Sequence, residues 1–223
     1  MHSTAVFVMA LRKSSEIPKD AVILDEMEAA GYIWNIIADW EPLSDIWSLR
    51  YGAVALGAVS SLSGLLINKH YRWRFKLGNY GYLSSTIPIV VMPGLLTLLF
   101  HKQLVTTNIL LMKNSACPIC HEIRSGVVQL GFGIAYPMLL APTSALMFAN
   151  RYSTYRVPHL TEGAKVMFKF LRVHTKSLTG TLAYIATLQL AASAVVTYLE
   201  MRNNITLRHK LAEIERKLES GLS

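Results

Sequence analysis

The sequence predicts an all-α membrane protein, a bundle of four transmembrane helices with an amphipathic helix at each end. Of the 223 residues, 52% are hydrophobic, and the mean hydropathy is +0.34. The apolar residues gather in four blocks that contain no Asp, Glu, Lys or Arg. Blocks of about 17–25 such residues match the thickness of a bilayer core. The predicted spans are about 51–67, 80–100, 125–149 and 178–199.

Aromatic residues mark the edges of these spans. All four tryptophans lie outside them, and tyrosines such as Tyr51 and Tyr80 lie at their rims. Aromatic belts of this kind form at the level of the lipid headgroups. We therefore divide the chain into an N-terminal interfacial region, 1–48, a four-helix transmembrane domain, 49–200, and a C-terminal amphipathic helix, 201–223.

Residues 20–47 have the pattern of one or two amphipathic helices. Acidic residues crowd the start, where a helix N-terminus favours negative charge, and Glu41-Pro42 ends the run. Apolar residues recur between them at spacings of three and four. We expect the apolar face to rest at the membrane interface, with docking on a partner as the alternative. The residues predicted for this face are Ile23, Met27, Ala30, Trp34 and Ile37.

The spans contain residues that favour close helix packing. Gln129 and Gln189 are strongly polar, and hydrogen bonds between helices explain both. No ionisable residue lies inside any predicted span, which disfavours ion-coupled transport because transporters usually keep such a residue at depth. Small residues let helices approach closely in lipid. They form one stripe in the first span (Ala53, Gly57, Ser61, Gly64) and another in the fourth (Ala183, Thr187, Ala191).

The C-terminal region predicts a soluble amphipathic helix. Its apolar residues recur at spacings of four, three and four, with charged residues around them, which makes a seam of two heptads. Two heptads are too short for a coiled coil of their own. A partner helix, or the N-terminal region of the same chain, would complete the seam. Its residues are Leu207, Leu211, Ile214 and Leu218.

The net charge of +8 is distributed unequally. Loops 68–79 and 150–177 carry ten basic residues and one acidic residue, whereas the other connections and tails carry twelve basic and thirteen acidic residues. Short basic loops stay on the cytosolic or matrix side of a membrane, so both termini are expected on the opposite side. The basic loops suit membrane lipids, including anionic ones such as cardiolipin, as partners. We do not interpret this charge as a nucleic-acid-binding surface.

Cys117-Pro-Ile-Cys120 contains the only two cysteines. The spacing is that of redox motifs, and the nearby helix start and Arg124 would lower a thiol pKa. Membrane thiol oxidoreductases relay electrons from a second cysteine pair, which this chain lacks. A structural disulfide or two unreactive thiols are therefore the simpler interpretations, with redox catalysis as the third. A four-ligand zinc site and other catalytic or cofactor motifs are not evident, so we expect no enzyme activity, cofactor or metal.

The segment after the cysteines carries further motif positions. The pattern continues through Arg124-Ser125-Gly126, Tyr136-Pro137, Leu140-Ala141, Ala149, Arg151-Tyr152 and Pro158-His159. Over about 45 residues this pattern resembles the transmembrane protein 126 family. The end of the first span, Gly64-Leu65-Leu66-Ile67-Asn68 followed by basic residues, is similar to the family more loosely.

The resemblance implies a non-catalytic scaffold in the mitochondrial inner membrane that aids assembly of the membrane arm of respiratory complex I, NADH:ubiquinone oxidoreductase. Complex I membrane-arm subunits and other assembly factors would be its partners. A permanent accessory subunit of complex I is the first alternative, and a CxxC thiol-disulfide membrane oxidoreductase is the second. The resemblance also favours basic loops in the matrix, which places Cys117 and Cys120 on the intermembrane-space side, where a disulfide can form.

Overall fold

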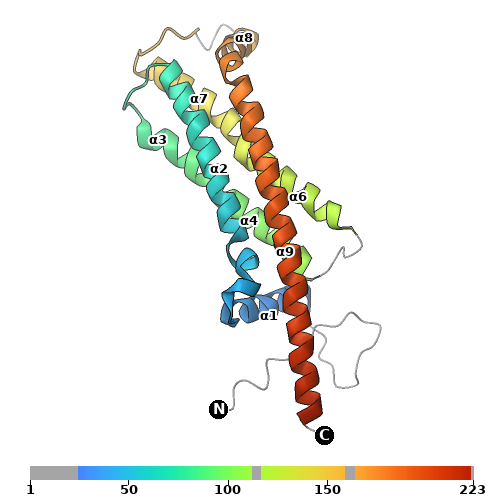
Figure 1. The fold of residues 1–223 in the computed structure, drawn as a ribbon. Coiled ribbons are helices and arrows are strands. Elements are labelled where there is room, and N and C mark those ends of the chain that lie inside the picture. Colours follow the sequence, from blue (N-terminus) through green and yellow to red (C-terminus); the bar gives the residue numbers. More distant parts are fainter. Residues whose placement is uncertain (1–24, 112–116, 159–163, 222–223) are drawn as a thin grey trace.

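The computed structural model describes residues 25–111, 117–158 and 164–221. All regular structure within these ranges is helical (Figure 1). Four helical segments are long and apolar enough to cross a membrane, so the predicted fold class is confirmed. They are Trp47–Arg74, Tyr82–Leu110, Pro118–Arg151 and Lys165–Ile214.

Three of the four segments are composite helices. The first is the single helix α2, Trp47–Arg74. The second joins α3 (Tyr82–Thr86), η2 (Ile87–Val91), α4 (Met92–His101), η3 (Lys102–Thr106) and α5 (Thr107–Leu110). The third joins α6 (Pro118–Leu130), η4 (Gly131–Ala135) and α7 (Tyr136–Arg151). The fourth comprises α8 (Ala164–Thr175), the 3-10 turn η6 (Lys176–Leu178) and α9 (Thr179–Gly221).

The elements η2, η3 and η4 are π-helical turns inside the second and third segments. Pro88 lies within η2, and Pro137 is the second residue of α7, which begins where η4 ends. Proline removes a backbone donor from the α-helical ladder, and neighbouring turns adjust to it. Each π turn therefore changes which side chains of its segment face the bundle.

The N-terminal helix α1, Glu26–Asp39, is held against the bundle. Asp25 and Glu28 form a capping box at its start, and the helix ends before Glu41-Pro42 as predicted. The predicted apolar face is partly wrong: Ala29, Ile33 and Ile37 are buried, whereas Met27 is exposed. Ile23 lies outside the described residues.

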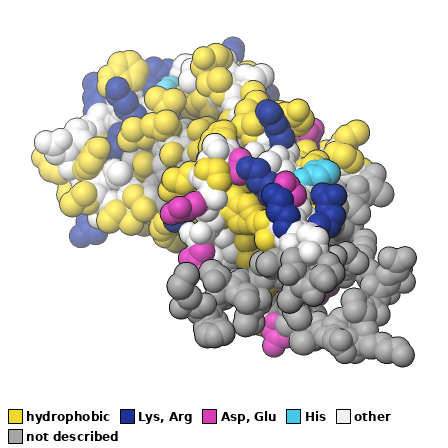
Figure 2. Space-filling view, turned by 60° about the horizontal axis from the view of Figure 1, so that its bottom comes forward, with side chains coloured by type: hydrophobic (Ala, Val, Ile, Leu, Met, Phe, Trp, Pro, Cys, Tyr) yellow, Lys and Arg dark blue, Asp and Glu magenta, His cyan; other side chains and the backbone are white. Residues whose placement is uncertain are grey.

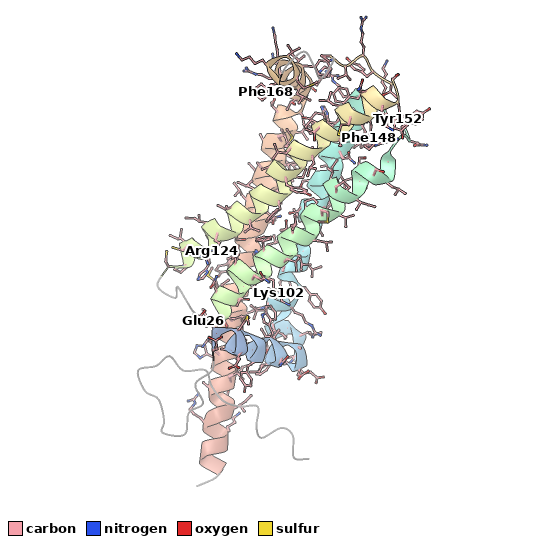
Figure 3. The ribbon with its side chains drawn as sticks, turned by 180° about the vertical axis from the view of Figure 1, so that it is seen from behind. Glu26, Lys102, Arg124, Phe148, Tyr152 and Phe168 are labelled. Atoms are coloured by element: carbon pink, nitrogen blue, oxygen red, sulfur yellow. The ribbon has the colours of Figure 1, made fainter. Side chains whose placement is uncertain are left out.

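The contacts of α1 explain this shift of its apolar face. Its buried side chains pack against residues from α2, α5 and the second half of α9, so α1 covers the chain's own helices. Lys102, labelled in Figure 3, lies 4.1 Å from the centre of the Trp34 ring and adds a cation–π contact. The short 3-10 turn η1, Leu43–Asp45, connects α1 to α2.

Small residues bring α2 and α4 together as predicted. A Cβ atom on Gly57 would lie 2.8 Å from the Gly94 carbonyl oxygen of α4, so neither helix has room for a larger residue there. The matching prediction for the fourth span is wrong. Ala183, Thr187 and Ala191 are exposed, and a polar row on another face of α9 points into the bundle.

The two ends of the bundle differ in surface composition. Helix α8 lies across the end that also carries the connection from α2 to α3, and α1 lies near the other end, beyond which α9 projects (Figure 1). Figure 2 views the α9 end, where acidic and basic side chains are mixed; hydrophobic surface separates it from basic side chains farther back.

Candidate functional site

A buried carboxylate cluster joins three helical segments near the α1 end of the bundle. The Glu200 carboxylate of α9 lies 3.2 Å from Nε2 of His101 in α4, and both side chains are 0% exposed. Thr106 donates its hydroxyl to Glu200 at 3.2 Å. The other ring nitrogen of His101, Nδ1, lies 3.3 Å from the hydroxyl oxygen of Ser125 in α6. We call Glu200, His101, Thr106 and Ser125 the carboxylate cluster.

Two local features of the backbone make this cluster fit. His101 and Thr106 are five residues apart, and a regular α-helix would point them about 140° apart. The π turn η3 begins directly after His101 and ends with Thr106, and it lets both side chains face Glu200. On the other side, a Cβ atom on Gly52 of α2 would lie 2.8 Å from Glu200 Oε1, so glycine leaves the space for the carboxylate.

The cluster corrects the expectation that the spans hold no ionisable residue. His101 and Glu200 lie one residue beyond the predicted spans 80–100 and 178–199, but the helices continue past both. The end of an uncharged block marks where charges begin, and a helix need not stop there. Within the described residues the cluster's polar atoms pair with one another, so its direct physical effect is to tie α4 and α9 together through the hydrogen-bonded contact of His101 with Glu200 and to add α6 through Ser125.

A second polar contact lies nearer the start of α9 than Glu200 does. Gln129 of α6 donates its side-chain amide to the side-chain carbonyl of Gln189, which confirms the predicted hydrogen bonding between helices. Gln189 in turn donates to the Ser63 hydroxyl of α2 at 2.9 Å. Ser63 donates to the Gly133 carbonyl in η4 at 2.5 Å, so this contact connects three helical segments.

The cysteine pair lies at the start of α6. Cys117 is the N-cap residue and Cys120 is exposed, and both are free thiols. A hydrogen bond from the Cys120 thiol lowers the pKa of Cys117, and backbone N–H donors add to this. Arg124, labelled in Figure 3, donates to the Leu104 carbonyl at 3.1 Å. A disulfide between the two cysteines stays a prediction, as does redox chemistry.

The remaining motif positions are mostly packing residues. Gly126 faces α9, where a Cβ atom would lie 3.2 Å from Leu190. Pro137 is buried, and Tyr136 is half-buried in the same turn. Tyr152 stacks on Tyr80 with 4.8 Å between ring centres.

Arg151 and the end of the motif are different. Arg151 is exposed beside Tyr152 at the end of α7. His159, the last motif position, lies outside the described residues. The motif segment therefore contributes Ser125 to the carboxylate cluster and Tyr152 to the far end of the bundle.

Part of the C-terminal seam packs against another helix of the same chain. Leu207 is buried in a core cluster with Ile33 and Ile37 of α1, and Leu211 packs against the same cluster. This favours the N-terminal region as the partner of the first half of the seam. Ile214 is 38% exposed, and the side chain of Leu218 lies outside the described residues.

Arg72 is a site residue that sequence reasoning missed. It looked like one of four basic residues in a connecting loop, yet it lies in the last turn of α2 and is only 6% exposed. Its guanidinium donates to the carbonyls of Gly78 and Tyr80 at 2.7 and 2.9 Å and to the Ser85 hydroxyl at 2.8 Å. Arg72 therefore holds the connection between α2 and α3 in shape.

Together these features define a class: an all-helical protein with four membrane-crossing segments, whose polar interior residues fasten the helices to one another. The family model described as "Transmembrane protein 126" matches residues 34–216. The chain belongs to this family, which confirms the resemblance drawn from the motif.

Individual relatives agree with the family match. "Transmembrane protein 126" of Drosophila melanogaster is 38% identical over 207 residues, which cover 93% of each chain. "Transmembrane protein 126A" of Mus musculus is 32% identical over 117 residues, 52% of this chain and 59% of the relative. "Complex I assembly factor TMEM126B, mitochondrial" of the same species is 30% identical over 108 residues, 48% and 46% of the two chains. No solved structure matches this chain.

Proposed function

We propose that this protein is a non-catalytic scaffold of the mitochondrial inner membrane that assists assembly of the membrane arm of respiratory complex I. The observation that carries the proposal is membership of a family in which mouse and rat relatives are named mitochondrial complex I assembly factors. The partners would be membrane-arm subunits and other assembly factors.

The arrangement of polar and apolar groups supports a binding role. The carboxylate cluster and the glutamine pair are buried between helices, where they stabilise one packing of the bundle. Large apolar side chains are exposed along the membrane-crossing segments, among them Leu62, Val127 and Leu139. A rigid bundle with such faces suits contact with other membrane helices as well as lipid.

The end of α9 is the second surface that we assign to partners. Figure 1 shows α9 projecting beyond the bundle at this end, and Ile214 is exposed there among charged residues. A helix–helix contact with an assembly partner would cover Ile214 and extend the seam that Leu207 and Leu211 begin against α1.

Depletion of the protein tests the assembly role. We expect loss of mature complex I and accumulation of membrane-arm intermediates on native gels, with re-expression of the wild-type chain restoring both. The protein itself should migrate with the intermediates. Normal complex I levels in depleted cells would rule the proposal out, and migration only with the finished complex would identify a permanent subunit instead.

A matched pair of variants tests the α9 surface. Ile214→Glu places a charge on the exposed apolar position, whereas Ala212→Glu adds the same charge two residues earlier, on a different face of the helix. We expect Ile214→Glu to reduce co-migration with intermediates by at least fivefold at unchanged protein level, and Ala212→Glu to behave as wild type. Equal behaviour of the two variants would exclude this surface.

Orientation is part of the proposal, with loops 68–79 and 150–177 facing the matrix. The two cysteines lie at the opposite end of the third segment from Arg151, so they report on the other side of the membrane. A membrane-impermeant maleimide should label them once the outer membrane is opened, with or without a reductant according to their redox state. Labelling only after the inner membrane is dissolved would show that the two cysteines face the matrix, which is the opposite orientation.

A further inference from the structure

A pocket of about 640 Å³ opens where α2 ends and the connection to α3 begins. Three basic residues line it, Lys69, Arg72 and Lys76. The other lining side chains include Asn68 and the aromatic residues Trp73 and Tyr82. The Arg72 hydrogen bonds described above hold the wall that this connection forms.

Among the described residues, no salt bridge balances the positive charge of the pocket. Between Asp45 and Glu122 the sequence contains no acidic residue. Within the described part of the chain, the hydrogen bonds of Arg72 go to carbonyl and hydroxyl oxygens, and neither Lys69 nor Lys76 forms a salt bridge. A cleft lined by one sign of charge attracts a ligand of the other sign.

The backbone at Lys76 is unusual for a lysine. Helix α2 ends in a Schellman motif, with hydrogen bonds from Leu77 N to Arg72 O and from Lys76 N to Trp73 O. Lys76 takes the left-handed position of this motif, with φ of 52°, where glycine is the usual residue. The side chain of Lys76 lines the pocket, so this unfavourable backbone conformation places the lysine ammonium group beside the pocket.

The pocket also lies at the boundary between apolar and polar surface. Leu65 lines its inner side on α2, and exposed Leu62 continues the apolar surface along the helix. Trp73, 74% exposed, and Tyr82 have the positions of a headgroup-level aromatic belt. Helix α8 crosses the same end of the bundle with Phe168 exposed, as interfacial helices do (Figure 3).

Asn68 adds an unused polar group to this pocket. The residue is 2% exposed, and its side-chain oxygen has no hydrogen-bond partner among the described residues. A buried amide oxygen without a donor carries a desolvation cost. A hydroxyl group of a ligand headgroup, or a water molecule held beneath it, would satisfy this oxygen.

We propose that this pocket binds the headgroup of an anionic phospholipid. Its phosphate would lie against Lys69 and Lys76, within the positive field of Arg72, and its acyl chains would follow the apolar surface of Leu65 and Leu62. The proposal depends on the membrane location of the chain and is independent of its role in assembly.

The test uses the purified full-length protein and two defined lipids. Native mass spectrometry would measure retention of phosphatidylglycerol and phosphatidylcholine from equal mixtures, where we expect phosphatidylglycerol to be preferred. The double variant Lys69→Gln/Lys76→Gly removes both exposed cations, and glycine suits the left-handed backbone at position 76. Each lysine near an anionic headgroup contributes about fivefold to its affinity. The double variant should therefore bind phosphatidylglycerol about 25-fold more weakly than the wild-type protein does.

The matched control is Lys165→Gln/Lys169→Gln, which removes two exposed lysines from α8 at the same end of the molecule. It should keep most of the preference. An equal loss in both double variants would mean unspecific surface attraction and would overturn the proposal. Displacement of the lipid by glycerol 3-phosphate at millimolar concentration would identify a site for soluble phosphates instead. Complex I assembly in cells is measured separately. The lipid-binding proposal can therefore fail while the assembly role stands, and the assembly role can fail while the lipid-binding proposal stands.

Discussion

The two ends of the bundle each bury an ionisable side chain, and they satisfy its hydrogen bonds in opposite ways. Arg72 donates to groups that lie six to thirteen residues away in the chain. Glu200 accepts hydrogen bonds from His101 and Thr106, which lie 99 and 94 residues away. The first arrangement therefore shapes one connection, and the second ties together helices that are distant in sequence.

This difference predicts where a mutation acts. Loss of a long-range buried contact weakens the packing of whole helices and should lower global stability. Loss of a short-range contact frees one connection and should appear mainly as local opening.

Removal of one partner from the carboxylate cluster should be the most damaging change. His101→Leu leaves the Glu200 carboxylate buried with Thr106 as its remaining donor, and breaking a buried pair in this way costs about 3–5 kcal/mol. The double variant His101→Leu/Glu200→Leu removes both polar side chains and should recover most of the loss. Unfolding by sodium dodecyl sulfate, followed by tryptophan fluorescence, measures both variants.

The double variant is the control for the contact between His101 and Glu200 itself. If it is no more stable than His101→Leu, packing of the imidazole matters rather than pairing of the carboxylate. Wild-type stability of His101→Leu would contradict the long-range role of the cluster altogether.

Arg72→Gln should have a smaller and more local effect. The connection loses several charge-assisted hydrogen bonds, together worth about 2 kcal/mol where lipid headgroups and water can replace part of them. Amide exchange should quicken at residues 75–81 before it does in the centres of the helices. Arg72→Lys should restore little because an ammonium group cannot reproduce the planar fork.

The control for this prediction is Arg74→Gln, which removes a neighbouring cation that donates no hydrogen bond within the described residues. It should exchange as wild type does. Uniform acceleration across all helices in Arg72→Gln would show that Arg72, like Glu200, supports the whole bundle.

The sequence predicted the features that depend on composition and short periods. Four uncharged blocks predicted the membrane-crossing segments. Two glutamines inside those blocks predicted hydrogen bonding between helices, and the two form a hydrogen bond with each other. The motif from Cys117 to Tyr152 identified the family and included Ser125, whose contact with His101 no sequence pattern indicates.

The features that the sequence did not predict depend on tertiary contacts. Hydropathy shows where charges begin but not where a helix ends, so His101 and Glu200 looked like loop residues. Arg72 and Lys69 carry the same charge, so the sequence gives no reason to expect different roles. Arg72 differs because residues 75–81 fold around its side chain and accept its hydrogen bonds. Small residues in the first and fourth spans have similar spacing, yet only the first stripe faces a neighbouring helix.

The smallest effect should come from the ion pair between Lys210 of α9 and Asp45 of η1. This pair spans 165 residues of sequence, but its lysine is 42% exposed. The hydrogen bond from Lys210 is the main cause that lowers the pKa of Asp45, so the charged carboxylate stabilises the fold. Exposed pairs contribute little, and Lys210→Met should lower the melting temperature by only about 1–2 °C at pH 7.

The pH dependence gives the sign of this last effect. A carboxylate whose pKa is lowered in the folded state adds stability above the ordinary aspartate pKa of about 3.9, and that stability disappears as the pH falls through the lowered value. The difference between wild type and Lys210→Met should therefore shrink below about pH 4, and Asp45→Asn should behave like Lys210→Met at pH 7. A loss as large as that of His101→Leu would mean that separation in sequence, rather than burial, decides how much a contact contributes.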